Sequence, residues 1–120
     1  MDNNNKSLCD TEYIVISCSG ASDTGEITDN VARRLRKNLV RSMNCLASVG
    51  AGNQDLIEKL KESNLLLIDG CMGDCAKKIA DKAGIRKYHH LRITDLGYEK
   101  GKTPVTEEVL NQVYLTADKI

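Results

Sequence analysis

Apolar residues along the chain alternate between short continuous runs, typical of buried strands, and spacings of three or four residues, typical of amphipathic helices. The run at residues 65–68 has four apolar residues in succession, as in a strand that is covered on both faces. Helical periodicity is clearest at Ile27, Val31 and Leu35, which share one face. The pattern predicts strands at residues 13–17, 43–46, 65–68 and 88–94, and helices at 25–37, from 53 onward, at 76–82 and at 106–117.

This strict alternation of strands and helices predicts an α/β fold of the Rossmann-like or flavodoxin-like kind. Strands separated by helical crossovers form a parallel sheet, with helices packed on both of its faces. We expect about four strands in three layers, with residues 65–68 at the centre. Asp23 and Glu26 have the spacing of a capping box for the first helix. A chain of 120 residues suits one core, so we expect a polar tail over residues 1–12 and a single domain over 13–120.

Charge and composition narrow the classes of partner. Lys plus Arg and Asp plus Glu each number 17, so the net charge is zero. The chain therefore lacks the excess of positive charge that is typical of proteins that bind nucleic acids or membrane surfaces. The basic cluster at residues 33–37 is expected to be a solvated helix face. The first residues lack the apolar stretch of a secretory signal, and no apolar run approaches the roughly 18 residues of a membrane span. We therefore expect a cytoplasmic protein whose partner is a metal ion, a small molecule or another protein.

The cysteines carry the main chemical signal. Five cysteines in a reducing compartment favour metal binding or thiol chemistry over structural disulfides. Cys18, Cys45, Cys71 and Cys75 follow or end predicted strands, and the loops after parallel strands gather at one edge of the sheet. Four thiolates are a complete tetrahedral ligand set for zinc. Cys9 precedes the first strand and is predicted to lie apart from this site.

The spacing of Cys71 and Cys75 also favours a metal. Residues four apart on a helix have Cβ atoms about 5 to 6 Å apart. A disulfide needs Cβ atoms at about 3.5 to 4.5 Å, whereas two ligands of one zinc ion tolerate the wider separation. This argument requires Cys71 to lie within the helix or just before it.

The same residues resemble a known family. The resemblance rests on the motif Asp69-Gly70-Cys71 with Cys75, on residues 18–22, on residues 43–47 and on residues 94–97. On these motifs the sequence resembles the DGC domain proteins, small prokaryotic proteins described as zinc-binding. The resemblance covers about residues 13–97. It implies that the same four cysteines bind a metal, but it brings no established reaction.

Two acidic residues and two histidines near these loops have alternative interpretations. Asp69 either caps the following helix or supports the cysteine loop through hydrogen bonds. Asp95 follows the last strand and either supports the same site or caps a turn beside Gly97. His89 and His90 are expected at the end of the last strand far from the cysteines, in structural or solvent-facing positions and not as ligands.

Two functions remain open from the sequence. In the first, a closed site of four cysteines holds zinc for a structural or metal-carrying role, with an iron–sulfur cluster as a second possibility for the cofactor. In the second, the protein is a thiol-dependent enzyme, a reductase or a sulfur transferase. Cys18 or Cys71 would then be the nucleophile, and Cys45 or Cys75 would be the resolving partner.

Overall fold

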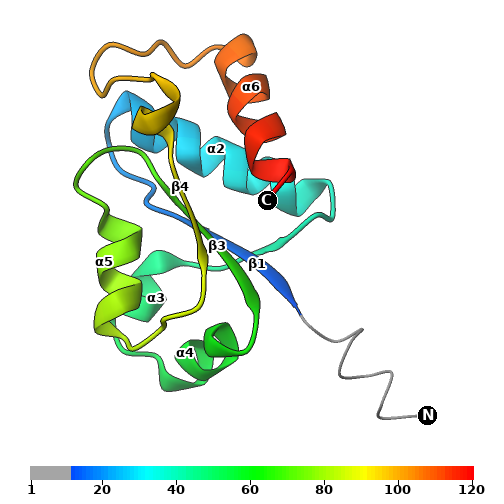
Figure 1. The fold of residues 1–120 in the computed structure, drawn as a ribbon, viewed down its shortest axis with the longest axis vertical. Helices are drawn as coiled ribbons and strands as arrows, with labels where there is room; N and C mark the ends of the chain where they lie inside the picture. Colours follow the sequence, from blue (N-terminus) through cyan, green and yellow to red (C-terminus); the bar gives the residue numbers. More distant parts are fainter. Residues whose placement is uncertain (1–11) are drawn as a thin grey trace.

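In the computed structural model, which describes residues 12–120, strands and helices alternate along the chain (Figure 1). The strands are β1 (Tyr13–Ser17), β2 (Ser42–Met43), β3 (Asn64–Asp69) and β4 (His89–Arg92). The helices are α2 (Asp23–Lys37), α3 (Leu46–Gly50), α4 (Gln54–Lys61), α5 (Cys75–Lys82) and α6 (Glu107–Asp118), with a 3-10 helix, η1 (Ile93–Leu96), after β4. Cys9, which was predicted to lie apart from the other four cysteines, is outside the described residues.

All four strands are parallel, in the spatial order β2-β1-β3-β4. Ile14 of β1 is level with Ser42 on one side and with Leu65 on the other. The predicted parallel sheet and the central place of residues 65–68 are both confirmed. The order reverses between β1 and β3, so the loops after these two strands flank the point where sheets of this kind bind ligands.

Helices cover both faces of the sheet because side chains alternate along each strand (Figure 1). Val15, Leu66 and Ile68 pack against α2 and α6. Ile14, Leu65 and their neighbours on the opposite face pack against α3, α4 and α5. The predicted three-layer α/β arrangement is therefore confirmed.

The start of α2 differs from the predicted capping box. Ser22 is the N-cap, and its hydroxyl accepts a hydrogen bond from the Gly25 N–H at 3.1 Å. The Asp23 carboxylate instead accepts bonds from the Gly101 N–H at 2.8 Å and the Thr103 N–H at 3.0 Å. These bonds lower the pKa of Asp23. Asp23 therefore ties a distant loop to α2, which only the tertiary structure brings within reach.

The two edge strands are shorter than predicted. β2 ends at Met43, and Cys45 is already the N-cap of α3, although the Asn44 N–H still donates to the Val15 carbonyl at 3.1 Å. β4 ends at Arg92, after which the chain turns into η1 and leaves it at Gly97, with φ 98°. An edge strand has a partner on one side only, so a competing helical turn can end it early.

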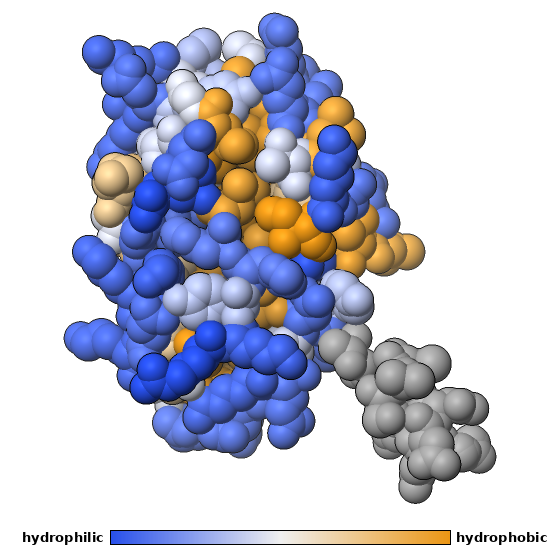
Figure 2. All heavy atoms as spheres, viewed as in Figure 1, coloured by the Kyte–Doolittle hydropathy of each residue, from blue (hydrophilic) through white to orange (hydrophobic). Residues whose placement is uncertain are grey.

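The surface has both polar and apolar areas (Figure 2). Figure 2 shows polar side chains over α4 and α5 and an apolar area in the upper half of the same view. Within residues 12–120, no helix has the length and apolar character needed to cross a bilayer.

Candidate functional site

The loops that follow β1 and β3 are in direct contact at the carboxyl edge of the sheet. The Cys18 N–H donates to the Ile68 carbonyl at 3.0 Å, which places Cys18 beside the end of β3. In return, the Gly70 N–H donates to the Cys18 sulfur at 3.3 Å. Cys18 is half-buried, with the Thr28 hydroxyl oxygen 3.4 Å from its sulfur. The first cysteine of the sequence pattern is therefore joined to the middle residue of the Asp69-Gly70-Cys71 motif.

Gly70 is required by this close approach. A Cβ atom at this position would lie 2.9 Å from both the backbone carbon and the carbonyl oxygen of Thr24, at the start of α2. Backbone atoms at that distance cannot move aside as the end of a flexible side chain can. Any larger residue at position 70 would therefore push the β3 loop away from α2 and from Cys18.

Cys71 and Cys75 lie at the two ends of one tight turn. Cys71 precedes α5, and Cys75 is its first residue, so the pair does not share a helix face as the spacing argument assumed. The reason is local, because Asp74 adopts the left-handed conformation with φ 50° and separates the two cysteines. The Gly73 N–H donates to the Cys71 sulfur at 3.4 Å. A Cβ atom on Gly73 would lie 3.5 Å from the Cys71 sulfur and 3.9 Å from the Cys75 sulfur, so both sulfurs border this glycine.

Asp69 supports this turn from the end of β3. It is buried, and its carboxylate accepts hydrogen bonds from the Ala76 N–H at 2.8 Å and the Lys77 N–H at 3.2 Å. Asp74, the N-cap residue by position, makes no side-chain cap bond. Asp69 therefore caps α5 in its place, which is one of the two roles considered from the sequence.

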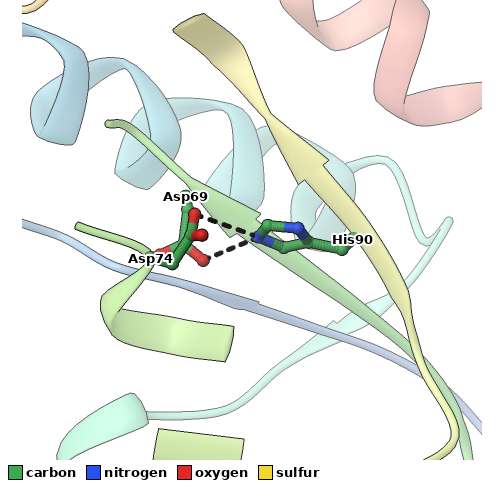
Figure 3. Close-up of side chains that lie close together, drawn as sticks. All are labelled: Asp69, Asp74 and His90. Atoms are coloured by element: carbon green, nitrogen blue, oxygen red, sulfur yellow. Dashed lines mark hydrogen bonds and ion pairs between the residues drawn. The ribbon is translucent and has the colours of Figure 1, made fainter. Parts of the chain in front are cut away.

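Two side chains of β4, His90 and Arg92, hold the same turn from the other side, and Figure 3 shows His90 beside Asp69 and Asp74. The His90 Nε2 atom lies 2.8 Å from Asp69 Oδ2 and 3.8 Å from Asp74 Oδ1. Arg92, two residues further along β4, donates from Nε and Nη2 to the two oxygens of Asp74, at 2.8 and 2.6 Å. We refer to Asp69, Asp74, His90 and Arg92 as the clasp.

The clasp is electrostatically matched. The bidentate bond from Arg92 lowers the pKa of Asp74, and the same bond raises the pKa of Arg92. Arg92 also reaches Asp95, with 3.3 Å between Nη1 and Oδ1. Planar guanidinium and carboxylate groups paired in this way fix orientation as well as charge. The turn that bears Cys71 and Cys75 is thus anchored at Asp69 on one side and at Asp74 on the other.

The position of His90 corrects a prediction. His90 was expected far from the cysteine loops, but its imidazole contacts Asp69, two residues before Cys71. The reason is the strand register: β4 runs along the carboxyl half of β3, and His90 is level with Leu67. Alternation along β4 then places the side chains of His90 and Arg92 on the same face.

Arg92 was missed by the sequence analysis. A weak signal existed, because a basic residue two positions after a histidine in a predicted strand shares its face. Asp95 does reach the carboxyl edge, but its side chain is 62% exposed and bonds to Arg92. Its contact with the site is therefore indirect.

Cys18, Cys45 and Cys71 lie in three loops of this edge, and Cys75 is the first residue of α5. Cys45 and Cys75 are exposed, and Cys18 and Cys71 are half-buried. Cys18 and Cys45 border one pocket, whereas Cys71 borders another. Among residues 12–120, the group of three or more potential ligand atoms within 4.8 Å of one another is Asp69, Asp74 and His90, and it contains no sulfur.

That oxygen and nitrogen group is poorly suited to a cation. Both oxygens of Asp74 accept hydrogen bonds from Arg92, and both oxygens of Asp69 accept backbone N–H groups of α5. A metal ion would have to displace the guanidinium and compete with the helix cap. We therefore interpret these residues as supports of the cysteine-bearing turn.

Comparison with known proteins identifies the family. The model of the DGC domain matches residues 14–117. This chain belongs to the DGC domain family. It is similar to the anaerobic and virulence modulator AnvM of Pseudomonas aeruginosa, with 27% identity over 88 residues, which are 72% of this chain and 67% of that protein. No solved structure matches the chain.

Membership of the DGC family supports a role in metal binding. In this member, the three residues of the Asp69-Gly70-Cys71 motif have separate physical tasks. Asp69 caps α5 and contacts the imidazole of His90. Gly70 allows the loops after β1 and β3 to lie in contact, and its N–H donates to the Cys18 sulfur. Cys71 contributes a sulfur beside the first turn of α5.

Proposed function

We propose that this protein binds one zinc ion through Cys18, Cys45, Cys71 and Cys75, in a structural or metal-carrying role. The observation that carries the proposal is that three neighbouring strands, β2, β1 and β3, are each followed at the same sheet edge by at least one of these cysteines. Four sulfur ligands fill the tetrahedral coordination of zinc and leave no position for a reactive water.

The hydrogen bonds around the sulfurs support this donor set. Cys18 accepts the Gly70 N–H, and Cys71 accepts the Gly73 N–H. Backbone donors of this kind stabilise negative charge on a coordinating sulfur and fix its direction. The clasp then holds the turn with Cys71 and Cys75, as the groups behind metal ligands commonly do.

Closure of the site requires Cys18 and Cys45 to approach the turn with Cys71 and Cys75, because Cys18 and Cys45 border one pocket and Cys71 borders another. Cys18 is tied to the β3 loop, and the sulfurs of Cys71 and Cys75 already border Gly73. Cys45 is exposed at the start of the five-residue helix α3 and makes no side-chain cap bond there. We therefore expect both the loop between β2 and α3 and the turn with Cys71 and Cys75 to move when zinc binds.

Metal analysis tests the proposal directly. The protein is purified anaerobically without a metal-affinity tag, its metal content and free thiols are counted, and the metal-free form is titrated with zinc. We expect about one zinc ion per chain, lost in Cys71→Ser and kept in the control Cys9→Ser. Structural zinc can contribute on the order of 10 kcal/mol to the folding of a small site, so Cys71→Ser should also melt at a lower temperature.

Two results would overturn this function. One is a protein that carries no metal and binds none on titration under reducing conditions. The other is an unchanged zinc stoichiometry in single serine variants of all four cysteines. A stable iron–sulfur chromophore in place of zinc would keep the site and change the cofactor.

A further inference from the structure

The pocket that borders Cys18 and Cys45 combines three kinds of surface. It has a volume of about 600 Å³ and lies beside the carboxyl ends of β1 and β2. Arg33 and Arg36 of α2 line one part, and Met43 and Ile79 contribute apolar side chains. This volume is within the usual range of about 300 to 1,000 Å³ for small-molecule sites.

The positive charge in this pocket is only partly neutralised. The Arg33 Nε atom is 2.9 Å from Asp29 Oδ2, so this guanidinium already has a carboxylate partner. Arg36 has no carboxylate within ion-pair distance among residues 12–120, and it lies on the same helix one turn further on. Within this part of the chain, Arg36 is therefore the guanidinium of the pocket that is available to a carboxylate of a ligand.

The two sulfurs differ in access. Cys45 is exposed at the rim of the pocket. Cys18 is half-buried and its sulfur accepts the Gly70 N–H. Since thiol–disulfide exchange requires an in-line approach to an accessible sulfur, Cys45 is the thiol that a pocket ligand reaches first.

We propose that this pocket binds a small disulfide bearing carboxylate groups, and that Cys45 undergoes thiol–disulfide exchange with it. The carboxylate pairs with Arg36, the methylene groups contact Met43 and Ile79, and the disulfide lies against Cys45. A neutral metabolite would leave Arg36 without a partner, and an anion without a disulfide would not react with Cys45.

The exchange is balanced without a further reactant. The Cys45 thiol loses its proton to solvent, and the thiolate attacks one sulfur of the disulfide. A bond forms between Cys45 and that sulfur as the disulfide bond of the ligand breaks. The other half leaves as a thiolate and takes up a proton from water. Cys45 is oxidised, and the departing half is reduced.

This inference goes beyond zinc binding and does not depend on it. Cys45 cannot hold an adduct and coordinate a metal through the same thiolate. Adduct formation and metal binding should therefore compete. The two proposals can fail separately, because metal content and adduct formation are measured independently on one preparation.

The test uses glutathione disulfide as the anionic probe and bis(2-hydroxyethyl) disulfide as the neutral one. The full chain, before and after treatment with a chelator, is incubated with each probe, and adducts are located by peptide mass spectrometry. We expect one glutathione adduct, on Cys45, with a rate that saturates as the probe concentration rises. Arg36→Ala should raise the half-saturating concentration about tenfold, as expected for loss of a charge-assisted bond.

Lys37→Ala is the matched control. Lys37 is exposed on the same helix but does not line the pocket, so its removal changes net charge equally and should leave saturation unchanged. The neutral disulfide should react equally with the parent protein and both variants. The proposal is overturned if the rate rises linearly without saturation. It is also overturned if adducts spread evenly over Cys45, Cys71 and Cys75. A third contrary result is an equal rise of the half-saturating concentration in Arg36→Ala and Lys37→Ala.

Discussion

Replacement of Asp69 by alanine should lower the free energy of unfolding, because Asp69 caps α5 and contacts His90. The Asp69 carboxylate is buried and accepts the N–H groups of Ala76 and Lys77, in the first turn of α5, at 2.8 and 3.2 Å. It also contacts His90 Nε2 at 2.8 Å. Alanine removes all three contacts and leaves the space of a carboxylate empty.

The magnitude follows from these contacts. Loss of a helix N-cap acceptor costs about 0.5 to 2 kcal/mol. Loss of the partner of His90 adds about 1 kcal/mol, the usual net value of an intramolecular hydrogen bond. We expect the free energy of unfolding to fall by about 2 to 3 kcal/mol, from the roughly 5 to 15 kcal/mol typical of a domain. For a chain of this size, the melting temperature should fall by about 10 °C.

Urea unfolding followed by circular dichroism measures this effect, with metal content kept equal between samples. Asp69→Asn keeps one acceptor oxygen and should lie between the parent and the alanine variant. Asp95→Ala is the matched control, because its side chain is 62% exposed and bonds to Arg92 alone, so it should change the free energy by less than about 0.5 kcal/mol. Equal losses in Asp69→Ala and Asp95→Ala would refute the capping argument.

Two further perturbations test the loops around the site. Gly70→Ala should cost about 1 to 3 kcal/mol in urea unfolding, since its Cβ would lie 2.9 Å from backbone atoms of Thr24, whereas Gly20→Ala, with no atom within 4 Å, should be nearly neutral. A neutral Gly70→Ala would show that the loops separate without cost. Arg92→Ala should lower stability at neutral pH, because Arg92 holds the pKa of Asp74 below its usual range. A carboxylate with a lowered folded-state pKa stabilises the fold above its unfolded pKa, and this contribution is lost as the pH falls through the folded value. The stability difference between parent and Arg92→Ala should therefore shrink below about pH 4, and a difference independent of pH would contradict this origin.

The sequence alone was sufficient to predict the architecture of the fold. Helical and strand periodicities are local properties, and βα alternation permits few topologies, so the parallel sheet and its central strand could be predicted. The same reasoning placed the four cysteines at the ends of strands or just after them, and β1, β2 and β3 are each followed by at least one of these cysteines. Whether their sulfurs share a metal stays a prediction.

Strand register and loop contacts were decided only by the tertiary structure. No local pattern shows that β4 lies along the carboxyl half of β3, and this offset brings His90 to Asp69 and Arg92 to Asp74. A glycine in a sequence motif also does not reveal which backbone it contacts. Gly70 lies against the backbone at the start of α2, which only the structure shows. These contacts join residues far apart in the sequence, and their geometry depends on the packing of whole elements, which periodicity does not contain.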